Sequence, residues 1–135
     1  KEVVPYHVIS LSPKEYNEYT SENNQGTVSS LLNKLHKEVK KKLGEGKHIV
    51  DKYPGCAIGD IMETKADSNY VEVASASILA REGAIEQLNG LSRKLGMNVP
   101  KGSSHVKEAL LSLKKSGKDP REFVKMHFRN VKEMF

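Results

Sequence analysis

Residues 65–81, KADSNYVEVASASILAR, constrain the fold more than any other part of the chain. The acidic residue Asp67 stands on a short turn, and a helix rich in alanine and serine follows it at once. Small side chains let such a helix pack closely against a sheet or another helix, with the carboxylate at its start. Asp51, sixteen positions upstream, ends an apolar run that predicts a buried strand.

Length and composition indicate one globular domain over residues 1–135. Apolar residues make up 37% and charged residues 29% of the chain, unlike a disordered sequence. No run approaches the roughly 18 apolar residues of a membrane span. The single cysteine, Cys56, cannot form an internal disulfide, and no basic-then-apolar leader opens the sequence. These features lead us to expect a cytoplasmic protein with no membrane partner.

The net charge of +5 favours polyanionic partners. Lysines crowd residues 37–42 and 114–118, where they also suit the C-terminal ends of helices by complementing the helix dipole. The five histidines show no zinc spacing, so we do not expect structural zinc.

Periodicity and capping residues divide the chain into alternating strands and helices, which predicts an α/β fold. In the first half we expect a strand over residues 3–11, a short helix from a Ser12 capping box to about residue 19, a long helix from Thr27 to about residue 43, a strand over 47–51 and a weak edge strand over 57–64. In the second half we expect a helix over 68–89 that resumes over 91–95, a helix capped by Ser103 or Ser104 that ends at Ser116, and a last helix from Asp119-Pro120 toward residue 135.

Two carboxylates from separate segments are candidates for a metal site. Asp51 at a strand end and Asp67 at a helix start offer the oxygen ligands that Mg²⁺ and Mn²⁺ prefer. Each residue also has an ordinary structural role: Asp51 can cap the turn after the strand, and Asp67 can complement the helix dipole. Asp60 and Glu63 are further possible ligands, although we expect them to be solvated turn residues.

Other reactive groups are less informative. Cys56 has no evident histidine partner, so we expect a spectator thiol. Lys65, Arg81 and residues 125–129 are plausible polyanion contacts, as is the loop from Lys101, which carries an ammonium and a hydroxyl toward a helix N-terminus. That loop is equally consistent with a capped helix and a solvated lysine. We expect His127 and Phe128 to be a core pair rather than a base-stacking surface.

Several motifs together carry a family resemblance. Residues 65–81 resemble the signature of the type 2 ribonucleases H, an acidic residue followed by V-A-x-A-S-I-L-A-R/K. Further segments are similar to the ribonuclease HIII branch: PKEYN at 13–17, LH at 35–36, VDKY at 50–53, VPKGSS at 99–104 and VKMHFRN at 124–130. The matches keep their order and span nearly the whole chain.

The resemblance implies a ribonuclease-H-like mixed sheet flanked by helices, with a helical C-terminal region. It also implies cleavage of the RNA strand of RNA–DNA hybrids, leaving 5′-phosphate ends, by Mg²⁺ or Mn²⁺ held on four acidic residues. Asp51 corresponds to the third acidic residue and Asp67 to the fourth, which is often Glu in the HIII branch. The residues expected to contact nucleic acid are Lys65, Ser68, Arg81, Lys101 and Ser103.

The chain departs from the family pattern at its front. The first two acidic residues of the family lie in a D-E-x-G segment on the first strand, and no such segment occurs here. We therefore expect the chain to be the C-terminal part of a catalytic domain, with the first strands absent and the remaining carboxylates supplied by a missing N-terminal segment or a second chain. The alternative is a catalytically incomplete nucleic-acid-binding module.

Overall fold

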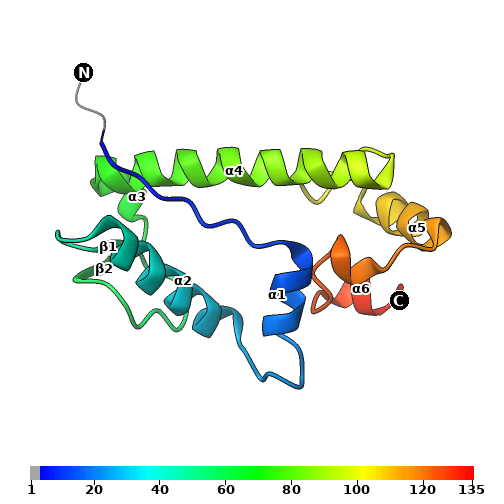
Figure 1. The fold of residues 1–135 in the computed structure, drawn as a ribbon, viewed down its shortest axis with the longest axis horizontal. Helices are drawn as coiled ribbons and strands as arrows, with labels where there is room; N and C mark the ends of the chain where they lie inside the picture. The colour runs from blue at the N-terminus through cyan, green and yellow to red at the C-terminus, as the bar shows by residue number, and fades with distance from the viewer. Residues whose placement is uncertain (1–3) are drawn as a thin grey trace. The chain divides into compact units, whose positions relative to one another are not determined.

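A computed structural model describes residues 4–135 as helices with a short parallel sheet, which confirms the expected α/β class (Figure 1). The elements are α1 (Pro13–Tyr19), α2 (Val28–Leu43), β1 (Ile49–Asp51), β2 (Ile61–Glu63), α3 (Ala66–Asn69), α4 (Val71–Leu95), α5 (Val106–Ser116), the 3₁₀ helix η1 (Pro120–Glu122) and α6 (Arg129–Lys132). The chain divides into two compact units. Of the described residues, the first unit combines residues 4–9 with residues 26–82, and the second combines residues 10–25 with residues 83–135. The single domain over residues 1–135 stays a prediction.

The helix α2 in the first unit begins and ends where the sequence predicts. The Thr27 hydroxyl accepts a hydrogen bond from the backbone N–H of Ser30, and the Ser30 hydroxyl accepts one from the N–H of Thr27. This reciprocal cap satisfies two of the backbone donors that a helix start leaves without partners. The apolar stripe buries Leu31, and Gly44 ends the helix with a φ of +82° that favours glycine.

The strands β1 and β2 form a parallel pair. Ile49, Val50 and Asp51 lie opposite Ile61, Met62 and Glu63 in that order, and Val50 is 1% exposed. Both strands are three residues long and therefore shorter than the runs the sequence predicts.

The strand predicted over residues 3–11 is wrong for the described residues 4–11, which are not assigned to any strand; Val3 lies outside the described part. An apolar β-branched run becomes a strand only when a neighbouring strand pairs with its backbone. The side chains of Val4 and Tyr6 are 80% and 64% exposed, so this run does not bury the surface that its composition suggests.

The helix predicted from residue 68 is divided at a different point from the one expected. Tyr70 has an extended backbone, with φ −128° and ψ 117°, which ends α3 and separates it from α4. The helix α4 then continues through Gly90, where the sequence predicts an interruption. A glycine inside a helix costs only about 1 kcal/mol relative to alanine, so a long helix tolerates it.

The second unit packs around Leu91, Leu113 and Phe123, with apolar neighbours from the end of α4 and from the loop beyond it. Its α5 ends at Ser116 as predicted, but the predicted serine cap is wrong. His105 precedes α5 with a left-handed backbone, φ +61°, and its side chain makes no capping bond.

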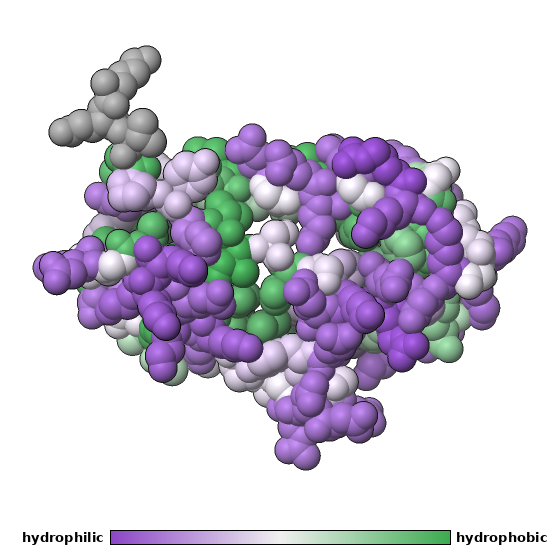
Figure 2. Space-filling model, in the orientation of Figure 1, coloured by the Kyte–Doolittle hydropathy of each residue, from purple (hydrophilic) through white to green (hydrophobic). Residues whose placement is uncertain are grey.

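The helix predicted from residue 119 to 135 is also interrupted. Asp119 does cap as expected, accepting a hydrogen bond from the N–H of Arg121, but only η1 and the four-residue α6 form. Polar residues cover most of the face displayed in Figure 2, as expected for a chain with 29% charged residues.

Candidate functional site

Asp51, the last residue of β1, is tied to the start of α3. Its carboxylate is exposed, and its Oδ1 accepts a hydrogen bond from the backbone N–H of Ala66 at 3.2 Å. Ala66 is fully buried, so its N–H is a fixed donor. The bond occupies one carboxylate oxygen and leaves Oδ2 available to a ligand.

Asp67 follows Ala66 directly and lies in the first turn of α3, with its side chain exposed. Lys65 precedes the helix in a left-handed conformation, with φ +58°, and this conformation turns the chain from β2 into α3. A non-glycine residue in this region is uncommon. The strand end at Asp51 and the helix that bears Asp67, separated along the sequence, are therefore joined by one backbone hydrogen bond.

Glu63 is a further carboxylate, which the sequence alone assigns to a solvated turn. It ends β2 in register with Asp51, and its two oxygens accept hydrogen bonds from the Tyr70 hydroxyl at 3.0 Å and the Asn69 amide at 3.4 Å. The bond to Glu63 is the largest of the causes that raise the pKa of Tyr70. The parallel register of β2 with β1 is what places Glu63 opposite Asp51, and this register is not evident from the sequence.

Asp60 serves the backbone of the same unit. Its Oδ2 accepts from the backbone N–H of His48 at 2.7 Å and from Lys40 Nζ at 3.4 Å. The bond to the His48 N–H is the main cause that lowers the Asp60 pKa, and the bond to Lys40 adds to it. Asp60 therefore holds α2 and the residue before β1 together.

Two histidines lie beside this contact. His36 Nδ1 is 3.3 Å from His48 Nε2, and the His36 ring stacks on the Tyr53 ring with a centroid distance of 5.7 Å. Burial lowers the pKa of both histidines. The pair therefore favours its neutral form, in which one nitrogen donates and the other accepts.

The ligand atoms of the described carboxylates are of the type that Mg²⁺ prefers, namely oxygen. Mg²⁺ is commonly bound through one or two carboxylates, several waters and substrate phosphates rather than by a cage of protein ligands. The free Oδ2 of Asp51 and the exposed carboxylate of Asp67 supply oxygen donors of that kind. Within residues 4–135, no three His, Cys, Asp or Glu side chains converge closely enough to hold an ion by themselves.

The predicted nucleic-acid contacts are all exposed. Lys65, Ser68 and Arg81 belong to the first unit, where Lys65 and Ser68 flank Asp67 in sequence and Arg81 lies on α4. Lys101 and Ser103 belong to the second unit, on the loop that leads into α5. The Cys56 thiol is free and half-buried. Among the helices described, none is both long and apolar enough to cross a bilayer.

A parallel strand pair with a carboxylate at the strand end and a second one at the following helix start agrees with the resemblance to type 2 ribonucleases H. The family model described as ribonuclease HII matches residues 1–131, and the chain belongs to that family.

Within the family, the chain is similar to proteins named ribonuclease HIII. One from Aquifex aeolicus (strain VF5) is 38% identical over 134 residues, and one from Bacillus anthracis is 34% identical over 155 residues. The alignments cover 95% and 98% of this chain and 50% of each relative. The resemblance to ribonuclease HIII is thereby confirmed, and the chain spans about half the length of the curated relatives it matches.

A solved structure is also similar, the crystal structure of Bst-RNase HIII in complex with Mn²⁺. The two structures superpose with a TM-score of 0.75 and 27% sequence identity, over 92% of this chain and 47% of that one. The fold expected from the sequence resemblance is therefore confirmed.

Proposed function

We propose that this chain is part of a ribonuclease H that hydrolyses the RNA strand of RNA–DNA hybrids with Mg²⁺ or Mn²⁺, giving 5′-phosphate ends. Family membership and the likeness to ribonuclease HIII proteins support the reaction. The similar structure in complex with Mn²⁺ supports the metal. The observation that carries the proposal is the hydrogen bond from the Ala66 N–H to Asp51, because it ties the strand end to the helix that bears Asp67.

In this proposal Asp51 and Asp67 hold the metal. Asp51 would hold the ion through its carboxylate, whose orientation is fixed by the hydrogen bond that Oδ1 accepts from the Ala66 N–H. Asp67 sits in the first turn of α3, where backbone N–H groups favour a negative charge. In such sites the metal supplies an activated water and stabilises the leaving oxygen.

The basic and hydroxyl side chains position the substrate. Lys65, Ser68 and Arg81 are the phosphate contacts of the first unit, and Lys101 and Ser103 are those of the second unit. Phosphate contacts fix register without reading sequence. Discrimination between RNA and DNA then rests on the 2′-hydroxyl of the ribose.

The remaining acidic ligands come from residues that precede this chain in a longer protein, or from a second chain. The absence of a D-E-x-G segment from the sequence and the half-length match to the relatives support this part of the proposal. We assign the activity to the cytoplasm, since the lone Cys56 is a free thiol of the kind expected in a reducing compartment.

Cleavage of a labelled RNA–DNA hybrid with Mg²⁺ or Mn²⁺, beside a chelator control, tests the activity. In the assembled enzyme, we expect Asp51→Asn to lower cleavage by more than about 100-fold, because the metal loses a charged ligand while the amide oxygen still accepts from Ala66. Glu45→Gln is the matched control, since it removes one exposed carboxylate that follows α2. Retained cleavage by a folded Asp51→Asn variant refutes the assignment.

The second candidate function is a catalytically incomplete nucleic-acid-binding module. It is favoured by the absence of a cluster of three ligands among residues 4–135. Such a module binds nucleic acid with a strong dependence on salt and shows no turnover. Metal-dependent cutting by this chain, alone or with the missing segment added, decides against it.

A further inference from the structure

The loop between η1 and α6 presents two neighbouring rings to solvent. The centroids of His127 and Phe128 are 4.3 Å apart with the planes tilted by 33°. His127 is exposed, and the Phe128 side chain is 50% exposed. The sequence-based expectation of a core pair is therefore wrong. The two rings form an aromatic platform on the surface of the second unit.

The orientation of the platform is fixed by contacts with α1. The Tyr16 hydroxyl lies 3.4 Å from His127 Nδ1, and Tyr16 is only 7% exposed. Burial raises the pKa of Tyr16, so its hydroxyl keeps its proton beside the imidazole ring. The His127 ring therefore lies against a buried neighbour, with 5.6 Å between the centroids of the two rings.

Asn17 fixes the backbone that leads to the platform. Its amide nitrogen donates to the carbonyl oxygens of Arg121 at 2.8 Å and Val124 at 2.7 Å, and its oxygen accepts from the N–H of Met126 at 2.9 Å. A surface held in place before binding loses less conformational entropy when a ligand docks on it.

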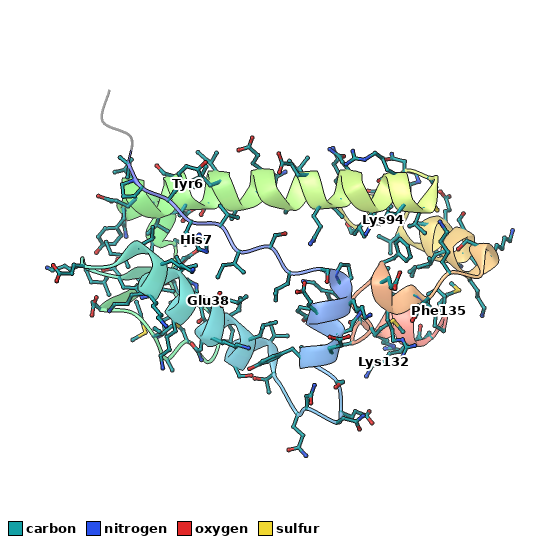
Figure 3. The ribbon with its side chains drawn as sticks, in the orientation of Figure 1. Tyr6, His7, Glu38, Lys94, Lys132 and Phe135 are labelled. Carbon is teal, nitrogen blue, oxygen red and sulfur yellow. The ribbon has the colours of Figure 1, made fainter. Side chains whose placement is uncertain are left out.

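Two lysines surround the rings. Lys125 Nζ lies 4.5 Å from the centroid of the Tyr16 ring, and Lys132, labelled in Figure 3, ends α6. Both charges contribute, after burial, to the lowered pKa of His127, which places them close to its ring. Neither lysine forms an ion pair within residues 4–135, whereas two nearby acidic residues do, Asp119 with Arg121 and Glu133 with Arg129.

We propose that His127 and Phe128, with Lys125 and Lys132, bind an unpaired nucleotide of a single-stranded nucleic acid. The base stacks on the exposed ring, and the flanking phosphates meet the lysines. Rings supply stacking for any base and lysines supply phosphate contacts, which is the combination found in sites for single strands. The two lysines form no ion pair among residues 4–135, and their positive charges favour a polyanion over an apolar protein partner. The inference rests on the proposed function, because an RNA–DNA hybrid that forms part of a longer strand is flanked by single-stranded nucleic acid.

Fluorescence anisotropy with labelled single-stranded RNA and DNA of about 12 nucleotides, in a chelator, tests this platform. Phe128→Ala should weaken binding by about 5- to 150-fold, the range of one lost base stack. Phe135→Ala is the matched control, because this phenylalanine is also exposed, at 43%, and lies in the same unit. Weaker binding of RNA or of DNA by Phe128→Ala supports the proposal and identifies which strand is bound. Unchanged binding of both strands overturns it.

Further variants separate stacking from folding and from cleavage. Phe128→Leu keeps apolar bulk without the aromatic ring, so a weakened complex with an unchanged circular dichroism spectrum identifies a lost stack. Lys125→Gln and Lys132→Gln should each lower the salt dependence of binding by about 0.7 units of slope. Asp51→Asn should bind the single strands as the wild type does. Loss of hybrid cleavage leaves this binding assay unaffected, so the two proposals fail independently.

Discussion

Asn17 is the residue whose removal best tests how the second unit is held together. Its amide makes three hydrogen bonds to backbone groups of residues 121–126, at 2.7–2.9 Å. A hydrogen bond contributes about 0.5–1.5 kcal/mol net, and partial exposure lets water replace some of it, so the three together contribute about 2–3 kcal/mol. Alanine is a better helix former than asparagine by about 0.5 kcal/mol, which offsets part of the loss. We therefore expect Asn17→Ala to lower the free energy of unfolding by about 2 kcal/mol.

Urea denaturation followed by far-UV circular dichroism measures this change as a shift in midpoint at an unchanged slope. Asn130→Ala is the control for helix propensity, because Asn130 lies exposed in α6, and we expect it to stay within about 0.5 kcal/mol of the wild type. Asn17→Asp keeps the acceptor for Met126 but directs a carboxylate at two carbonyl oxygens, so it should destabilise at least as much as alanine. A loss below about 0.5 kcal/mol in Asn17→Ala would refute the reasoning.

Two further predictions concern the first unit. Gly59→Ala should destabilise the protein by about 2–5 kcal/mol, because φ is +133° and an added Cβ would lie 2.9 Å from Val50 Cγ2. Gly44→Ala is the control: at φ +82°, with nothing within 4 Å of an added Cβ, it should cost only about 1–2 kcal/mol. Equal losses for the two variants in thermal or urea melts would contradict the predicted clash with Val50. Burial holds the pKa values of His36 and His48 below 6.5. On acidification the unfolded chain therefore takes up more protons than the folded chain. The contribution of this pair to stability should be full above about pH 6.5 and should be lost as the pH falls through the lowered pKa values. His36→Gln should flatten this slope in urea melts between about pH 7 and pH 5, and an unchanged slope would contradict it.

Local signals in the sequence predicted the helices well where the deciding contacts are local. The cap of Thr27 and the Ser12–Glu15 capping box each involve residues three positions apart, and both form as expected. The apolar run over residues 4–11 did not become a strand, because strand formation depends on a partner that the run itself does not specify.

The candidate site was predictable only in part for the same reason. The sequence indicated Asp51 at a strand end and Asp67 at a helix start, and the structure places both there. It offered Glu63 as a further possible ligand but favoured a solvated turn, because the parallel register that places Glu63 opposite Asp51 joins residues twelve positions apart. The exposed rings of His127 and Phe128 were missed because an aromatic pair near a chain end looks apolar in sequence whether it is buried or not.

The hydrogen bonds of Asn17 also bear on how the chain is made. They join residues 104 to 109 positions apart, so α1 has been synthesised long before residues 121–126 exist. Closing a loop of that length costs about 4 kcal/mol of chain entropy before the first contact forms. Contacts of such sequence separation slow folding. During synthesis the face of α1 around Asn17 therefore stays exposed to solvent. The contacts of the second unit can form only when nearly all 135 residues have left the ribosome.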